Sequence, residues 1–245
     1  MSMTEAYFDN LIRILETVRD GQREGMEKAA AAMAECVHQG HMVYTFGTGH
    51  GHLLALEVFY RAGGMAQVCP ILREDLMLHV NAAESSQVER REDLTEELLS
   101  RYPVGKGDVL FVISNSGRNA CPVLLAREAR KRGAFVIALT NLRHTRAVTA
   151  RNSAGLRLFE TADLVLDNGG ILGDASMEFP DGRFCGATST AVGAAILQAV
   201  TCRCREILLE KGWGGDFYMS SNVDGGDAVN QVLVEKYRDS IPGLG

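Results

Sequence analysis

The sequence predicts an α/β protein with a five-stranded parallel sheet flanked by helices, and a pair of helices ahead of the first strand. From residue 41 onward, short apolar runs alternate with helical segments, as in strand–helix–strand units. The runs at 109–113 (VLFVI) and 134–139 (AFVIAL) are apolar on both faces, which is typical of strands covered by helices on both sides. Gly133 precedes the second run, where a glycine favours the end of a helix.

Two amphipathic helices are predicted before the sheet, over residues 4–20 and 22–39. Their apolar residues recur at spacings of three and four, and Gly40 follows as a natural stop. A single sheet does not obviously need the apolar faces of both helices. We therefore expect these helices to pack as an antiparallel pair or to join a partner subunit, and a homodimer or higher homo-oligomer is the expected assembly.

The remaining elements follow the same patterns along the chain. Strands are expected at 42–46, 66–72, 109–113, 134–139 and around 164–166, with helices at 51–62, 120–132, 189–210 and 228–238. The charged residues 73–104 predict added helices, and the Gly- and Asp-rich residues 168–187 predict a long loop. We expect one domain over 1–245, with N-terminal helices over 1–40, an α/β core over 41–210 and a polar tail with a short helix over 211–245.

Composition excludes several classes of function. The formal net charge of −6 does not suit a general nucleic-acid binder, because phosphate backbones attract basic surfaces. Apolar stretches stay below the length of about 18 residues that a membrane span needs, and the N-terminus lacks the apolar region of a signal peptide. The six cysteines have no regular spacing, so we expect reduced thiols in a cytoplasmic protein.

Two loops carry the chemistry that the sequence suggests. Gly47-Thr48-Gly49-His50-Gly51-His52 follows the first strand, and Ser114-Asn115-Ser116-Gly117-Arg118-Asn119 follows the third. Ligands bind at the carboxyl ends of strands in open parallel sheets, and a helix N-terminus with glycines and hydroxyl groups can hold an anion. The alternative is that Ser116 or Asn119 only caps a helix. The two loops at one sheet edge together favour a phosphate site.

Nucleotide cofactors fit these loops less well. The dinucleotide fingerprint G-x-G-x-x-G fails because residue 52 is a histidine, and no G-K-[ST] sequence of a P-loop is present. We therefore expect the chain to work without a cofactor.

The paired stretches FGTGHGH and ISNSGRN resemble the sugar isomerase (SIS) domain family, which binds phosphosugars on a flavodoxin-like five-stranded parallel sheet. The second loop matches the family pattern S-x-S-G-x-[TS], with Asn119 in place of the usual threonine or serine. A third matching stretch, Ala187-Thr188-Ser189-Thr190, opens the last long helix. The resemblance is closest to a subgroup of phosphosugar-binding members, and it implies a usually dimeric protein. The substrate-binding residues implied are Thr48, Gly49, Ser114, Asn115, Ser116, Gly117, Asn119 and Ser189.

The resemblance implies a phosphorylated sugar as partner and an aldose–ketose or amino-sugar-phosphate isomerase that acts through an enediol. The alternatives are a non-catalytic phosphosugar sensor, or a lyase or etherase acting on N-acetylmuramic acid 6-phosphate. Isomerisation needs a base that moves a proton between adjacent carbons. The catalytic candidates are Glu57, His79 and His50, with Glu84 as a further carboxylate.

Each candidate has a structural alternative. Relatives such as the etherase place a catalytic glutamate where this chain has Arg61, and Glu57 lies one turn earlier, where it can instead form an i,i+4 ion pair with Arg61. His79 can be a partly buried structural histidine, and His50 can bond within its own loop. Some family isomerases bind zinc, but no cysteine or carboxylate at ligand spacing accompanies His50 and His52, so we expect no metal.

Overall fold

The five-stranded parallel sheet is confirmed in the computed structural model, which describes residues 2–245. Its order is β2-β1-β3-β4-β5, the flavodoxin-like order, and all four strand pairs are parallel. The connections from β1 and β3 therefore leave in opposite directions, and a crevice forms between the carboxyl ends of these two strands. The strands are β1 (Val43–Gly47), β2 (Val68–Pro70), β3 (Val109–Ile113), β4 (Phe135–Thr140) and β5 (Leu164–Asp167).

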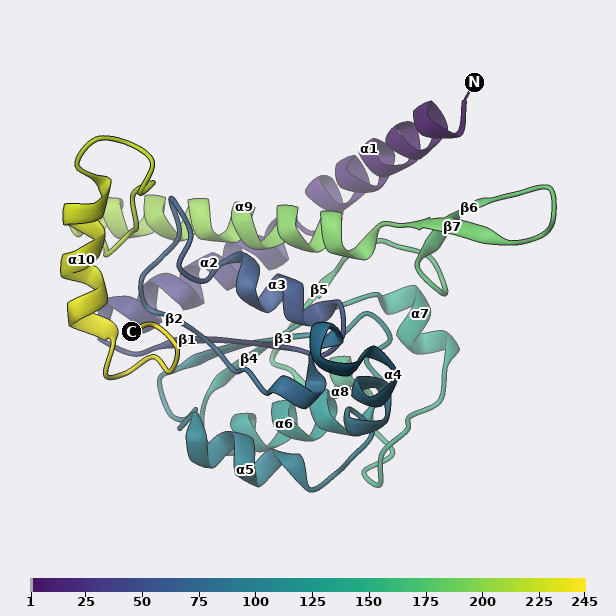
Figure 1. Ribbon diagram of the computed structural model, residues 1–245, viewed down its shortest axis with the longest axis horizontal. Helices are drawn as coiled ribbons and strands as arrows, with labels where there is room; N and C mark the ends of the chain where they lie inside the picture. Colours follow the sequence, from purple (N-terminus) through teal and green to yellow (C-terminus); the bar gives the residue numbers. More distant parts are fainter. Residues whose placement is uncertain (1) are drawn as a thin grey trace.

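Helices cover both faces of the sheet (Figure 1). Alternate strand residues face two apolar clusters: Phe111 packs with one set of helices and Val112 with the other. The first set is α1 (Met3–Gly21), α2 (Arg23–His38), α3 (Gly51–Glu57) and α9 (Ser189–Glu210). The second is α4 (Leu78–Val88), α5 (Leu94–Arg101), α6 (Ala120–Lys131), α8 (Leu158–Thr161) and α10 (Gly226–Tyr237).

The predicted helices before the sheet, α1 and α2, are present within one or two residues, and α9 begins and ends where the sequence predicts. No helix within residues 2–245 has the length and hydropathy to span a membrane. The helices expected over residues 73–104 are present as the 3-10 helix η1 (Glu74–Leu76), α4 and α5, whereas the short helices α7 (Leu142–Ala147) and α8 were not expected.

The prediction of a long loop over residues 168–187 was wrong. This segment contains an antiparallel hairpin of β6 (Ala175–Glu178) and β7 (Phe184–Ala187), which projects beside α1 (Figure 1). The hairpin turns at Pro180-Asp181-Gly182, and the Gly182 amide donates to the Phe179 carbonyl at 2.9 Å. Proline, aspartate and glycine are strong turn formers, so this turn was the available signal.

The helix predicted over 51–62 ends earlier, at Glu57, and β2 is shorter than predicted. The chain after α3 turns to pair with the tail: the Gly63 amide donates to the Tyr218 carbonyl at 2.8 Å, and Met65 forms a bridge with Phe217. These backbone bonds compete with continuation of the helix, and they are long-range contacts that local sequence patterns do not show.

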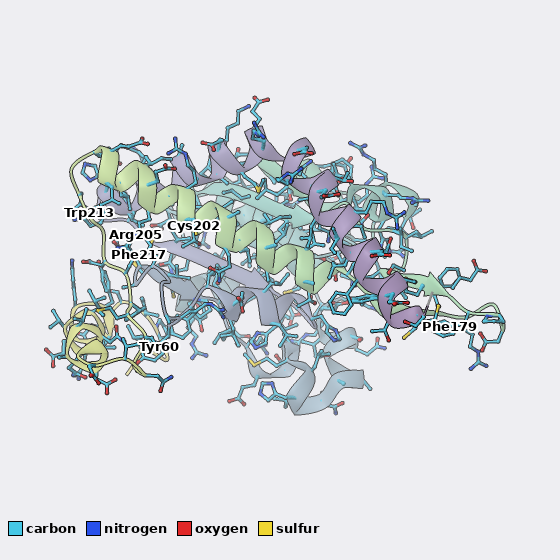
Figure 2. The ribbon with its side chains drawn as sticks, turned by 90° about the horizontal axis from the view of Figure 1, so that it is seen from above. Tyr60, Phe179, Cys202, Arg205, Trp213 and Phe217 are labelled. Atoms are coloured by element: carbon cyan, nitrogen blue, oxygen red, sulfur yellow. The ribbon has the colours of Figure 1, made fainter. Side chains whose placement is uncertain are left out.

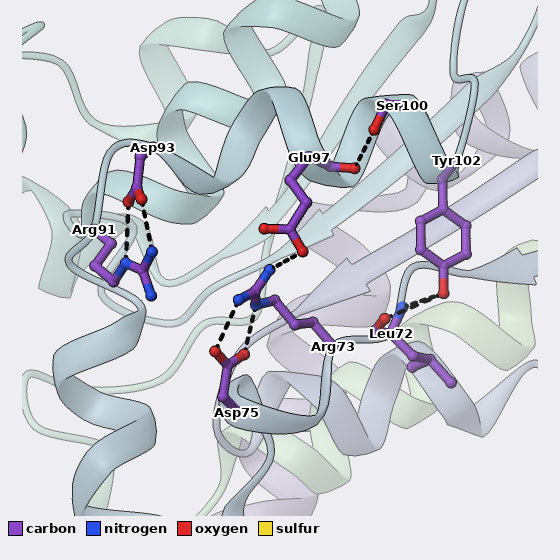
Figure 3. Close-up of polar contacts among 8 residues, drawn as sticks. All are labelled: Leu72, Arg73, Asp75, Arg91, Asp93, Glu97, Ser100 and Tyr102. Atoms are coloured by element: carbon purple, nitrogen blue, oxygen red, sulfur yellow. Dashed lines mark hydrogen bonds and ion pairs between the residues drawn. The ribbon is translucent and has the colours of Figure 1, made fainter.

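Ion pairs fix the charged excursion between β2 and β3 (Figure 3). Arg73 pairs with Asp75 at 2.6 Å and also with Glu97 of α5, so one guanidinium joins the two ends of the excursion. The Tyr102 hydroxyl bonds to the Leu72 amide and carbonyl at 3.2 and 3.1 Å. These contacts hold η1 and α5 together beside the end of β2.

Two glycines of the first loop allow α3 to approach the sheet closely. A Cβ on Gly51 would lie 2.7 Å from the Ile113 carbonyl oxygen at the end of β3. A Cβ on Gly47 would lie 2.3 Å from the Gly51 backbone. Real Cβ atoms do not tolerate such distances from backbone, so a side chain at Gly51 would push the two loops apart, and one at Gly47 would distort the first loop itself.

We expect Gly51→Ala to lower the free energy of unfolding by about 1–3 kcal/mol, as overpacking of a tight site does. Denaturant unfolding followed by circular dichroism measures this. Gly21→Ala is the matched control, because a Cβ at that helical position meets no atom within 4 Å. Equal stability of the two variants would show that the close approach is not required.

Candidate functional site

A cavity of about 490 Å³ lies beyond the carboxyl ends of β1, β3 and β4. It is bordered by both predicted loops, by α4, and by the start of α9 with the base of the hairpin. Among the residues proposed from the sequence, those that line it are Thr48, Gly49, His50, Ser114, Asn115, Ser116 and Ser189. The lining contains hydroxyls, amides, two imidazoles and two carboxylates, with no lysine or arginine from residues 2–245.

Most donors of the first loop are used within the protein. The Thr48 hydroxyl, 8% exposed, donates to a Glu89 carboxylate oxygen at 2.6 Å. The Gly49 amide donates to the Leu76 carbonyl at 3.3 Å, from a backbone with φ of 56° that favours glycine. His50 precedes α3, makes no capping bond and is exposed at the cavity. Of this loop, His50 therefore offers a side chain that a ligand can reach.

The second loop leaves two hydroxyl groups available. Ser114 accepts a hydrogen bond from the Gly117 amide at 3.2 Å, and the hydroxyls of Ser114 and Ser116 donate to no protein acceptor within residues 2–245. Gly117 has a φ of 55° and is buried behind the lining. A hydroxyl donates to a phosphate oxygen without adding charge, so the Ser114 and Ser116 hydroxyls suit an oxyanion.

A chain of amides holds this loop in place across three strand ends. The Asn115 side-chain oxygen accepts from Asn168 at 2.8 Å, and Asn168 in turn accepts from Asn141 at 3.0 Å. These residues lie just after the ends of β3, β5 and β4. Asn115 thus has a structural partner as well as a place in the lining.

At the start of α9 a carboxylate of the protein occupies the helix N-terminus. Asp174 accepts from the Thr188 amide at 3.1 Å, from the Ser189 amide at 2.9 Å and from the Ser189 hydroxyl at 2.5 Å. Because Asp174 takes these donors, an external phosphate has no free place there. The second loop is the better anion site.

The sequence did not point to Glu89, which lies inside the charged cluster Glu89-Arg90-Arg91-Glu92-Asp93. The structure turns Glu89 into the cavity, while Arg91 pairs with Asp93 at 2.6 Å on the surface (Figure 3). Burial raises the pKa of the Glu89 carboxyl. The hydrogen bond from Thr48 and the nearby charges of Arg90 and Arg151 act in the opposite direction, but burial is the larger effect. Asn119 does not line the cavity: it is 7% exposed and donates through Nδ2 to Glu89.

His144 is another cavity residue that the sequence did not indicate. It lies on α7, and the Gly173 amide approaches its Nδ1 atom at 3.5 Å. Burial, and then the positive charge of Arg118, lower the pKa of His144, so its imidazole is neutral at pH 7. A short helix of six residues gave no periodic signal by which to find it.

Glu57 and His79 lie outside the cavity lining. Glu57 pairs with Arg61 at 3.1 Å and accepts from Gln198 of α9 at 3.2 Å. His79 is exposed, and its ring centroid lies 6.4 Å from that of buried His52. Glu84 is exposed and bonds to Asn81 at 3.0 Å. Within residues 2–245, no three His, Cys, Asp or Glu side chains are grouped closely enough to hold a metal ion.

Known proteins resemble this chain in sequence. The SIS domain family model matches residues 6–141, which include both loops. The UPF0309 protein of Listeria innocua is 41% identical over 244 residues, which cover 99% of each chain. The UPF0309 protein of Geobacillus kaustophilus is 40% identical over 243 residues, covering 99% of this chain and 97% of the relative.

Solved structures share the fold at low sequence identity. A phosphoheptose isomerase from Francisella tularensis has a TM-score of 0.55 at 15% identity, covering 84% of this chain and all of that chain. The NanR protein of Vibrio vulnificus, complexed with ManNAc-6P, has a TM-score of 0.50 at 19% identity, covering 99% of this chain and 71% of that chain. The expected resemblance is confirmed, since the family model spans more than half of the sequence: the chain belongs to the SIS domain family.

Proposed function

We propose that the protein binds a phosphorylated sugar in the cavity at the carboxyl ends of β1 and β3. The observation that carries the proposal is the pair of free hydroxyls on Ser114 and Ser116, which face the same cavity as two imidazoles and a raised-pKa carboxyl. The phosphate sits on the second loop, and the sugar extends toward His50 and His144. Structural neighbours support this reading, since one was solved with ManNAc-6P and another is a phosphoheptose isomerase.

The reaction that this arrangement supports best is aldose–ketose isomerisation of a sugar phosphate or amino-sugar phosphate. A base removes the proton from the carbon beside the carbonyl, an enediol forms, and the proton returns to the neighbouring carbon. His144 suits the base because its lowered pKa keeps the imidazole neutral at pH 7, and its Nδ1 atom, which the Gly173 amide approaches at 3.5 Å, is the unprotonated nitrogen that takes the proton. His50, on the first loop, suits proton transfer between the two oxygens: it gives a proton to the carbonyl oxygen and takes one from the hydroxyl group of the neighbouring carbon. No cofactor takes part in this proposal.

A catalytic role for Glu57 or His79 requires a second copy of the chain to bring either residue to its partner's cavity. The contact of Glu57 with Arg61 supports the structural alternative of an ion pair. Arg61 stands where the etherase has its catalytic glutamate, and here it forms an ion pair with Glu57. No observation therefore favours etherase activity. A sensor without catalysis is the second candidate, because two of the three bases suggested by the sequence lie outside the lining.

We propose that the protein is a homodimer assembled through α1 and its neighbours. Phe8 and Ile12 of α1 are 58% and 52% exposed. An apolar groove of about 320 Å³ lies between α1, α2 and α9, where α1 crosses α9 (Figure 2). Phe179 at the end of the hairpin extends the same exposed apolar side (Figure 2). A second copy covers these surfaces, as the N-terminal amphipathic helices led us to expect.

We further propose that residues 1–245 form one domain of a cytoplasmic protein. Leu233, Tyr237 and Ile241 of the tail pack in the same apolar cluster as β3 and α6, which supports a single domain. All six cysteines are free thiols, and four are buried, which fits a reducing compartment.

Ser114→Ala and Ser116→Ala should each weaken phosphosugar binding by about tenfold, the effect of losing one charge-assisted hydrogen bond. Isothermal titration calorimetry measures the affinity. Ser100→Ala is the control, because the Ser100 hydroxyl donates to the Glu97 carbonyl on exposed α5 at 2.8 Å (Figure 3). Unchanged affinity in both loop variants would place the phosphate elsewhere.

A panel of hexose, hexosamine and pentose phosphates should include a substrate that the protein converts between aldose and ketose. For that substrate, His144→Gln should lower kcat by about 10²–10⁴, with little change in KM, as removal of a general base does. Glu57→Gln and His79→Gln, measured alongside, show whether a partner subunit supplies a base. Binding without turnover of any panel member would instead establish the sensor.

Analytical ultracentrifugation should give the mass of a dimer at micromolar concentration. Ile12→Glu should shift this equilibrium toward monomer, since it places a charge in the apolar groove. A monomeric wild-type protein would contradict the proposed assembly.

A further inference from the structure

Glu89 joins the two loops across the cavity. One oxygen of its carboxyl group accepts from Thr48 of the first loop at 2.6 Å, and the other accepts from Asn119 of the second. Its backbone carbonyl also accepts from the Cys121 amide at 3.0 Å, which fixes the end of α4 against the start of α6. Glu89 therefore has a fixed position beside the anion site, and it also lines the cavity.

Asn119 can form a hydrogen bond with Glu89 in either protonation state of the carboxyl group. The residue is only 7% exposed, and its buried Oδ1 atom has no hydrogen-bond partner within residues 2–245. An amide carries a donor and an acceptor in nearly equal positions, and their assignment follows from the hydrogen-bond network. With Nδ2 toward Glu89 the amide serves the ionised carboxylate; rotated by a half-turn, it presents Oδ1 to a protonated carboxyl.

The charges that line the cavity favour the protonated form once an anion is bound, whereas the two arginines behind Glu89 favour the ionised form. Asp174 is already an anion in the lining, and no cationic side chain of residues 2–245 lines the cavity to offset a second carboxylate. Behind Glu89, the charged groups that face it are Arg90 from its own segment and Arg151 from the segment after α7. The buried Cys121 thiol of α6 has its pKa raised to about 12 and stays neutral.

We propose that Glu89 takes up a proton when an oxyanion binds on the Ser114–Gly117 loop, so that ligand binding is coupled to protonation of this carboxyl. The inference rests on the proposed function, because it assumes that the second loop holds the phosphate. Burial raises the pKa of Glu89 before any ligand is present, and a nearby anion raises it further, since it repels the ionised form.

The sign of the pH dependence follows from linkage. Below the pKa of Glu89 in the free protein, the carboxyl is protonated both in the free protein and in the anion complex. The affinity for the anion is then independent of this group. Above that pKa, binding consumes a proton, and affinity for an anion of constant charge falls by up to about tenfold for each pH unit. The fall ends above the pKa of the complex. His50 lines the same cavity, so a His50 variant is included to separate any contribution of that residue from the contribution of Glu89.

Inorganic sulfate is the probe, because its charge is constant over about pH 5.5–8.5, unlike that of a phosphate whose second pKa is near 6. Calorimetric titrations in two buffers of different ionisation enthalpy count the protons taken up per sulfate bound. The proteins are the wild type, Glu89→Gln, His50→Gln and Glu74→Gln. Glu74 is the matched control: it is exposed on η1 in the same excursion, and its replacement makes the same change in net charge.

Sulfate binding with proton uptake is expected in the wild type, in Glu74→Gln and in His50→Gln. Glu89→Gln should take up fewer protons per sulfate than the wild type, because it lacks the carboxyl group. Above the pKa of Glu89 it should also bind sulfate more tightly than the wild type, by about tenfold for each pH unit above that pKa. Wild-type binding with no proton uptake at any pH overturns the inference without any variant, and so does equal uptake in Glu89→Gln. Both outcomes leave the anion site intact. Absence of sulfate binding at every pH overturns the proposed phosphate site as well.

Discussion

The close approach of two backbone segments at the boundary between β1 and β3 is the constraint on which the site depends. The strand order makes this boundary the place where connections leave in opposite directions. Gly47 and Gly51 let the first turn of α3 rest on the Ile113 carbonyl, at a distance that leaves no room for a Cβ. The first and second loops thus lie side by side, and the cavity opens where they meet. A bulkier residue at Gly51 would separate the groups that the proposed chemistry needs together.

Once the loops are close, their polar groups must find partners, and the protein's own carboxylates provide several. Glu89 takes the Thr48 hydroxyl and the Asn119 amide, while Asp174 takes the first donors of α9. These bonds stabilise the site without a ligand, and they leave the hydroxyls of Ser114 and Ser116 free. Because the first loop has internal hydrogen-bond partners and the second keeps free hydroxyls, two similar loops can have different roles. The first is largely structural, and we assign the phosphate to the second.

The sequence predicted what depends on local patterns. The apolar run 109–113 and the helix 189–210 follow from the spacing of apolar residues, and both match the structure closely. The positions of both loops followed from the rule for parallel sheets. The partners of individual side chains did not follow, because they depend on long-range contacts. Glu89 meets Thr48 across 41 residues of sequence, and nothing in the charged cluster around Glu89 distinguishes the one residue that turns inward. For Glu57, the i,i+4 spacing with Arg61 did indicate the ion pair that forms.

We assign the phosphate of a phosphosugar to the second loop, and a crystal structure with a hexosamine 6-phosphate bound is the decisive experiment. We expect a phosphate with oxygens about 3 Å from the hydroxyls of Ser114 and Ser116, with the sugar lying between His50 and His144. A phosphate bound at the start of α9 in place of Asp174, or outside the cavity, would contradict it.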